Sequence, residues 1–216
     1  MTARTVTLFQ KIRVMISGLK QSETSLTAAL KEWNVAVEAL AAGEAVVLLR
    51  KGGIREQEGR FYVRHNRVVL YPTFEHQTPH LLKPTYASGV REVESGWHPS
   101  TIKLSAWAVI DHILSIDVSA GLDRLQPFHV WNQKFVSERL QWNPHQLLYL
   151  LVLRTYRLPS AIEIPYLSAY GGCRSWINLA TAVDVKGSLP VLSDRAYEEI
   201  VAAVRDAAST SRGVSQ

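Results

Sequence analysis

The chain has 216 residues, of which 47% are apolar, and it carries a net charge of +5 with a pI near 9.4. The apolar fraction is that of a globular protein and excludes a wholly disordered chain, while the length suits one large domain. The single cysteine, Cys173, excludes an internal disulfide, and no apolar run approaches the roughly 20 residues of a membrane span. Lys11 and Arg13 interrupt the stretch where a signal peptide would be apolar, so we expect a cytoplasmic protein that does not contact a membrane.

The two ends of the chain differ in composition from its middle. Residues 1–25 show no sustained period and are rich in Thr, Ser, Lys and Arg, so we expect a flexible N-terminal extension. Residues 210–216 are expected to form a disordered tail. Residues 26–209 are expected to form a single α+β domain. The alternative is two lobes divided near 85–100, in the proline-rich stretch.

The first part of the domain predicts one helix followed by strands. A helix is expected over Leu26–Ala42, ending at Gly43, because its apolar residues recur at helical steps of three and four. The run 44–50 is apolar on both faces and predicts a central strand buried on two sides. Arg60–His65 and Arg67–Pro72 then predict a hairpin, with its turn at His65 and Asn66.

The second part alternates long apolar runs with short helices. Little regular structure is expected over 73–100. The alternation of 102–116 predicts a strand with a bend or bulge near 109–112. The further expectations are helices over 119–125 and 130–141, a buried strand over 145–158, shorter strands over 162–164 and 175–185, and a helix over 194–208 capped by Ser193. The fold class is therefore α+β, with a mixed or antiparallel sheet, or sheets, on which an N-terminal and a C-terminal helix pack.

The loop Lys51-Gly52-Gly53-Ile54-Arg55-Glu56 is the first candidate site. Two glycines after a buried strand let backbone amides approach a ligand, and Lys51 and Arg55 could then hold a phosphate or carboxylate. The spacing is not that of a Walker loop. The alternative is a tight turn with solvated charges.

Glu75, His76 and Gln77 place an acid, a titratable base and an amide together on a loop, where binding and catalytic residues often lie. His80 follows His76 by four residues, the spacing of a helical metal pair, but Pro79 opposes a helix through both. A surface histidine is the alternative to a catalytic one.

Three further patterns carry weaker signals. Asp184-Val-Lys186 has the acid-x-lysine form of many Mg²⁺-dependent nucleases, with Glu163 as a potential second acid, although such a match also arises by chance. Cys173 beside Arg174 could be an activated thiol, but no histidine follows it, so a buried structural thiol is favoured. Cationic and aromatic residues interleave at Trp131, Lys134, Arg139, Trp142, Arg154, Tyr156, Arg157, Arg174 and Trp176. Such a mixture suits single-stranded nucleic acid, whereas the alternative is that the aromatic residues belong to the core.

Several segments together resemble a bacterial family of unknown function. They are Leu48-Leu-Arg-Lys-Gly-Gly-Ile-Arg-Glu56, Leu70-Tyr-Pro-Thr-Phe-Glu-His-Gln77, Leu82-Lys83-Pro84, His129-Val-Trp131, Leu153-Arg-Thr-Tyr-Arg-Leu158 and Gly172-Cys-Arg-Ser-Trp176. The family is domain of unknown function number eighteen hundred and two, and the resemblance covers roughly residues 30–180. It brings no catalytic roles. Its relatives sometimes accompany helicase-like restriction components, which implies a link to DNA processing or defence.

The leading hypothesis is a nucleic-acid-associated protein that could be a metal-dependent phosphodiesterase, with Mg²⁺ as the candidate metal. Its candidate catalytic residues are Glu56, Glu75 and His76, with the two glutamates as metal ligands. Its candidate anion-binding residues are Lys51, Gly52, Gly53, Arg55, Gln77 and Lys83. The alternatives are a non-enzymatic binding or adaptor module for an acidic partner or small anion, and an enzyme on a small phosphorylated metabolite.

Overall fold

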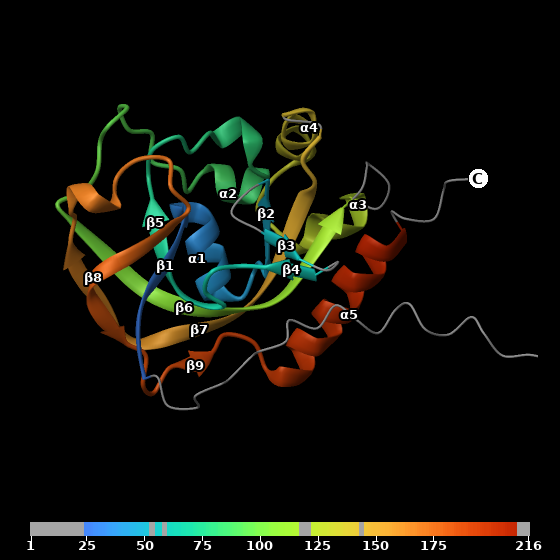
Figure 1. Ribbon diagram of the computed structural model, residues 1–216. Helices are drawn as coiled ribbons and strands as arrows, with labels where there is room; N and C mark the ends of the chain where they lie inside the picture. Colours follow the sequence, from blue (N-terminus) through green and yellow to red (C-terminus); the bar gives the residue numbers. More distant parts are fainter. Residues whose placement is uncertain (1–23, 52–54, 58–59, 117–121, 143–144, 211–216) are drawn as a thin grey trace, which may run out of the picture.

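The computed structural model describes residues 24–51, 55–57, 60–116, 122–142 and 145–210 (Figure 1). Its elements are β1 (Ser25–Trp33), α1 (Asn34–Ala42), β2 (Val47–Arg50), β3 (Arg55–Gln57), β4 (Arg60–Tyr62), β5 (Arg67–Thr73), η1 (Pro79–Leu81), α2 (Pro84–Ala87), β6 (Thr101–Ile116), α3 (Leu122–Leu125), η2 (Gln126–Phe128), α4 (Gln133–Gln141), β7 (Leu148–Pro165), η3 (Ser168–Tyr170), β8 (Trp176–Asp184), β9 (Leu189–Pro190) and α5 (Asp194–Thr210). The predicted α+β class is confirmed, since a mixed sheet carries the N-terminal helix α1 and the C-terminal helix α5.

The main sheet has the strand order β2-β7-β6-β5-β1-β8, and β9 adds to β7. Strands β1 and β5 are parallel, whereas the other pairs in this sheet are antiparallel. Strands β6 and β7 pair along almost their whole length and form the spine of the sheet. Their register shifts between Ile110 and His112, which confirms the bulge predicted near 109–112 and adds local twist to the sheet.

The sheet curves, and α1 packs inside the curve. Figure 1 shows α1 enclosed by strands β1, β5, β6 and β7, and α1 contacts each of these strands. Along β5, Val68 and Leu70 join one buried cluster whereas Val69 and Tyr71 join the other. Because strand residues point alternately to the two faces, this division shows that both faces of the sheet are buried at β5.

The helix predicted over Leu26–Ala42 is wrong in its first half. Residues Ser25–Trp33 form β1, which lies between β5 and β8, and helix α1 begins only at Asn34. Leu26, Ala28, Ala29 and Leu30 are buried on the two faces of β1, and the same close spacing of apolar residues also fits the helical period. The segment forms a strand because hydrogen bonding to a strand on each side outweighs local helix propensity. Gly43 ends α1 at a φ of 78°, as predicted.

The predicted hairpin is also wrong, because β4 pairs with β3 rather than with β5. Strand β5 pairs instead with β1 and β6, neither of which adjoins it closely in sequence. Strand β2 is an edge strand and not a central one. It is nevertheless buried, because Val47, Leu48 and Leu49 belong to the same core cluster as Trp131 and Phe135.

The C-terminal helix α5 matches its prediction closely. Ser193 Oγ accepts a hydrogen bond from the Ala196 amide at 3.3 Å, which caps the helix start as expected. Tyr197 packs its ring under the Arg154 guanidinium, 4.6 Å away, which ties the helix to β7. None of the helices that the structure describes is long and apolar enough to cross a lipid bilayer.

The burial of His129 is expected to make the unfolding free energy depend on pH. This residue is 1% exposed, and burial, with a smaller contribution from Lys83, lowers its pKa from 6.5 to about 3. The unfolded chain therefore takes up a proton below pH 6.5 that the folded chain does not, so stability falls as pH decreases. We expect His129→Phe to remove about 1.4 kcal/mol per pH unit from the slope of unfolding free energy between roughly pH 6 and 5, measured by urea denaturation.

The control for this prediction is His80→Phe at an exposed position. An unchanged pH slope in His129→Phe would contradict the assignment, even if the substitution alters the absolute stability through packing.

Candidate functional site

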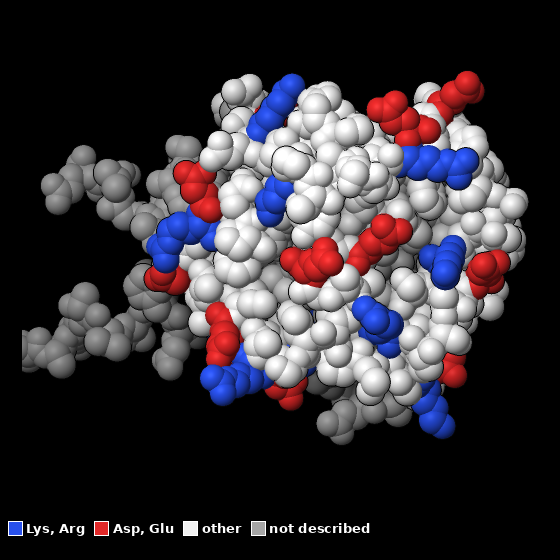
Figure 2. Space-filling model, turned by 180° about the vertical axis from the view of Figure 1, so that it is seen from behind, with Lys and Arg blue, Asp and Glu red and all other residues white. Residues whose placement is uncertain are grey.

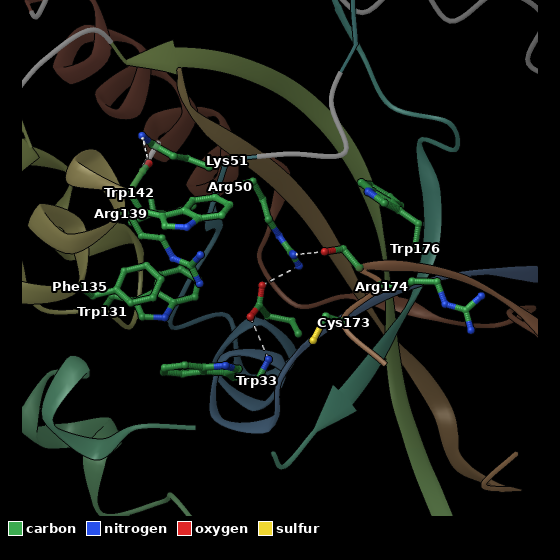
Figure 3. A pocket seen from close by; sticks show the side chains of 13 residues that line it. Trp33, Arg50, Lys51, Trp131, Phe135, Arg139, Trp142, Cys173, Arg174 and Trp176 are labelled. Atoms are coloured by element: carbon green, nitrogen blue, oxygen red, sulfur yellow. Dashed lines mark hydrogen bonds and ion pairs between the residues drawn. The ribbon is translucent and has the colours of Figure 1, made fainter. Parts of the chain in front are cut away.

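A cavity of about 710 Å³ opens where the edge strand β2 approaches β1, α4 and the loop before β8 (Figure 3). The residues that line it are Glu32, Trp33, Leu49, Arg50, Lys51, Trp131, Phe135, Arg139, Trp142, Cys173, Arg174, Ser175 and Trp176. Four of the six tryptophans in the chain are in this set. The lining also contains four cationic side chains against a single carboxylate. We call this cavity the basic aromatic pocket.

Arg50 holds the two sides of the pocket together. Its Nη2 lies 2.7 Å from Glu32 Oε2 and donates to the Lys31 carbonyl at 2.8 Å, and both of these partners belong to β1. Its Nη1 donates to Ser175 Oγ at 2.7 Å, in the loop before β8. The Arg50 and Glu32 side chains are only 15% and 10% exposed. Strand β2 is thereby joined to the far half of the same sheet.

An aromatic stack forms the α4 side of the pocket. The rings of Trp131 and Phe135 are stacked, with centroids 4.9 Å apart and planes at 14°. The Arg139 guanidinium lies over the Phe135 ring at 4.9 Å, and Trp33 meets the same ring edge-on. Arg139 follows Phe135 by four residues, so both project from one face of α4. The stack places a guanidinium over a ring at the pocket wall.

Arg139 is cationic and only partly hydrated. Burial lowers its pKa, and Glu32, Arg50 and Glu138 modulate it, Glu32 raising it most. Arginine stays protonated in proteins despite such shifts. Arg139 makes no hydrogen bond with any residue that the structure describes. Its donors are therefore open to a ligand.

Lys51 positions the rim of the pocket. It is 6% exposed, and its Nζ donates to the carbonyls of Leu140 and Trp142 at 3.1 and 2.7 Å. These carbonyls are at the C-terminal end of α4, where a cation is favourable. The Trp142 side chain itself is 58% exposed at the pocket. Lys51 thus fixes the backbone that presents an exposed indole.

The loop between η3 and β8 closes the remaining wall. Lys31 Nζ donates to the carbonyls of Tyr170 and Gly172 at 2.6 and 2.9 Å. Arg174 Nη2 donates to the Ala169 carbonyl at 2.8 Å. Burial lowers the pKa of Lys31, and Arg174 lowers it further. These bonds place the exposed Cys173 and Arg174 on the pocket wall.

Of the residues predicted as anion-binding, Lys51 lines the pocket. Gly52 and Gly53 lie outside the described residues. Arg55 and Glu56 belong to strand β3, which pairs with β4, but their side chains also lie outside what the structure describes. Their expected roles stay predictions.

The other predicted site residues lie away from this pocket. The Glu75 carboxylate accepts a hydrogen bond from the Gly96 amide, and His76 is exposed, with a φ of 60°. Gln77 is buried, where its Oε1 accepts from the Val35 amide in the first turn of α1 at 3.2 Å. Gln77 therefore satisfies a backbone donor at a helix start.

Lys83 has a similar part in the fold, because its ammonium donates to the carbonyls of Gln126 and His129. Asp184 accepts from the Lys186 amide at 2.9 Å, within an exposed turn, and Glu163 lies on β7, which does not adjoin β8. Among the described residues, no group of three His, Cys, Asp or Glu side chains could hold a metal ion.

Glu32, Trp33 and Arg50 line the pocket but were not among the site residues expected from sequence. Glu32 and Trp33 were placed within a helix, and Arg50 was counted as the end of a strand. Five of the nine interleaved cationic and aromatic residues do line the pocket: Trp131, Arg139, Trp142, Arg174 and Trp176. That interleaving was the signal that located five of the thirteen lining residues.

Residues 29–203 match a family described as Domain of unknown function (DUF1802). Comparison with curated proteins gives no significant match. Among solved structures, the chain is similar to a mutant of the ZmASCH protein from Zymomonas mobilis, with 13% identity, a TM-score of 0.37, and coverage of 81% of this chain and 94% of that chain. The site is therefore argued from its own residues.

The effects of substituting Arg50 and Glu32 on the unfolding free energy are expected to be coupled. Removing one partner leaves a largely buried charge, so we expect Arg50→Met and Glu32→Gln each to lower the unfolding free energy by about 2–4 kcal/mol. The double variant should lose less than the sum of the two, with a coupling of about 1–3 kcal/mol measured by urea denaturation. Additive losses would contradict the closure role assigned to this pair. The exposed pair Arg195–Glu199 is the matched control, with little coupling expected.

Proposed function

We propose that this protein, which belongs to the family described as Domain of unknown function (DUF1802), binds nucleic acid. Family membership brings no activity, so the proposal rests on the residues of the pocket. The observation that carries the proposal is the meeting of guanidinium groups and aromatic rings in one cavity. Guanidinium groups bind phosphate through paired hydrogen bonds, and aromatic rings stack on bases. A nucleotide presents both of these groups.

Arg139 and Arg174 are the phosphate-binding groups in this proposal. Arg139 has open donors, and Arg174 is exposed and uses one of its nitrogens on a backbone carbonyl. Arg50 adds to the positive electrostatic potential of the pocket but is not a ligand contact in this proposal, because its two Nη groups already bind Glu32, Lys31 and Ser175. Two of the four cationic side chains that line the pocket, Arg139 and Arg174, are therefore available to contact a ligand.

The face away from the view of Figure 1 does not offer the same surface. Figure 2 shows acidic and basic side chains interspersed over that face, without a broad stretch of one sign among the atoms drawn in colour. A protein that held nucleic acid by its outer surface would present a basic patch. The clustering of cations in the pocket supports recognition there rather than on this face.

A role in phosphodiester cleavage, linked to DNA processing or defence, is the finer form of the proposal. Its catalytic residues stay those predicted from sequence, Glu56, Glu75 and His76, with Mg²⁺ as the candidate metal. Glu75 and His76 do not line the pocket, so a cleavage site would place the chemistry at the β3 side, where Glu56 lies.

An enzyme acting on a small phosphorylated metabolite is the second candidate. A pocket beside Lys51, rather than an open groove, favours it, and a volume of about 710 Å³ suits a small molecule. A non-enzymatic module for a small anion would use the same cations without turnover. In that case phosphate-containing ligands raise the Tm and are recovered unchanged.

Nucleic-acid binding is tested by fluorescence anisotropy with labelled single- and double-stranded DNA and RNA at several salt concentrations. We expect log K to fall linearly with log salt, because phosphate contacts release counterions. Arg139→Ala should weaken binding about 10-fold and reduce the salt slope by about one. Arg195→Ala, an exposed arginine on α5, is the charge-matched control. Absence of binding to all four ligands at low salt would refute the proposal.

Cleavage is tested separately with end-labelled DNA and RNA in the presence of Mg²⁺ or Mn²⁺. If the finer proposal holds, Glu56→Ala abolishes product formation while the anisotropy curves stay unchanged, because the metal-bound step and the binding step use different residues. An inactive wild-type protein under both metals would refute the catalytic part alone.

A further inference from the structure

We infer that the basic aromatic pocket takes an unpaired nucleotide of a strand, with its base against the aromatic rings and its phosphate on Arg139, so that the protein selects single strands over duplexes. This inference rests on the proposed function and names its substrate class. Its support is that an exposed indole and a guanidinium lie together inside a recessed cavity.

Trp142 presents an aromatic face that the fold itself does not use. Its indole is 58% exposed, which is unusual for so large an apolar ring. Its backbone is nevertheless held on both sides, because its amide donates to the Glu138 carbonyl at 2.9 Å and its carbonyl accepts from Lys51 at 2.7 Å. A fixed backbone under an exposed ring provides a stacking platform with little conformational entropy to lose.

The α4 side of the pocket offers a second planar surface next to Trp142. Phe135 stacks on Trp131 and carries the Arg139 guanidinium over its ring, 4.9 Å from the ring centroid. Arginine planes stack on bases as aromatic rings do. The edge of the same guanidinium carries the donors that a phosphate needs. Figure 3 shows both Trp142 and Arg139 directed into the pocket.

The recessed position of these surfaces excludes paired bases. In a duplex, each base is covered on both faces by its neighbours, and only its edges reach the grooves. Rings inside a cavity between α4 and the loop that carries Arg174 can therefore stack only on a base that has left the helix. A volume of about 710 Å³ admits a nucleotide unit but not a double helix.

The test uses 2-aminopurine, a fluorescent base whose emission falls when it stacks. One oligonucleotide carries it at a central position and is studied alone and annealed to its complement, with DNA and RNA versions at equal salt. We expect the single strand to bind about 10-fold more tightly than the blunt duplex and to show quenching, because stacking on one ring contributes a factor of this size. Trp142→Ala should lose most of that preference and the quenching, while the salt slope stays unchanged.

Two variants separate stacking from folding. Trp142→Phe keeps a ring and should restore part of the preference. Trp97→Ala removes a half-exposed tryptophan that packs against Phe74 outside this pocket, and it should change neither the preference nor the quenching. A loss of preference in Trp97→Ala equal to that in Trp142→Ala would overturn the assignment to the pocket.

Failure of this inference is distinguishable from failure of the proposed function. Equal affinity for single strand and duplex, with a linear salt dependence and no effect of Trp142→Ala, would overturn strand selection and leave nucleic-acid binding intact. No salt-dependent binding to any oligonucleotide would overturn both. Competition by a mononucleotide as strong as that by the oligonucleotide would overturn strand selection and assign the pocket to free nucleotides.

Discussion

The pocket depends on the reach of one arginine across the sheet. Arg50 lies on β2, the first strand of the order β2-β7-β6-β5-β1-β8, and its ion-pair partner Glu32 lies on β1, the fifth. These strands can meet only because the sheet curves, and α1 fills the curve. A buried ion pair contributes little net stability, since desolvation offsets the attraction. Its effect is to fix geometry: the wall formed by β2 stays opposite the walls formed by β1 and by the loop before β8.

Several polar side chains, inside the pocket and away from it, bind the backbone of the fold rather than remaining available for a ligand. Lys51, next to Arg50, uses its charge on the end of α4 rather than on a ligand. Lys83 and Gln77 likewise satisfy backbone groups of other elements. Polar side chains that a sequence suggests for anion binding are here consumed by closing the fold. Arg139, on α4, is the guanidinium of the pocket that makes no hydrogen bond with any described residue.

The fold was predictable from sequence where the signal is local. The strand β6 with its bulge, the apolar first part of β7 and the capped helix α5 each follow from period, composition or a cap within a single segment, whereas the strands expected over 145–158 and 162–164 are one continuous strand, β7. The strand β1 was not predictable in this way, because its apolar residues fit both periods and its partners β5 and β8 lie far along the chain. Strand order, and hence the edge position of β2, is a property of long-range pairing that no window of sequence contains.

The site shows the same division between residue type and arrangement. The interleaved arginines and tryptophans indicated a surface for nucleic acid, yet their grouping with Glu32, Trp33 and Arg50 required the closed sheet. Sequence also cannot separate a tryptophan of the core from one of a pocket wall: Trp131 is 1% exposed, whereas Trp142 is 58% exposed, within one short stretch of chain. Burial is decided by what the rest of the chain places over each ring.

The bond between Arg50 and Ser175 joins residues 125 positions apart, which has a consequence for how the protein matures. Contacts of such long sequence separation form late in folding, after the loss of chain entropy that they require. During synthesis, the first half of the chain therefore cannot assemble the pocket until the loop before β8 has emerged and docked. A chain that ends before this loop therefore lacks one wall of the pocket and the hydrogen bond that holds the wall to β2.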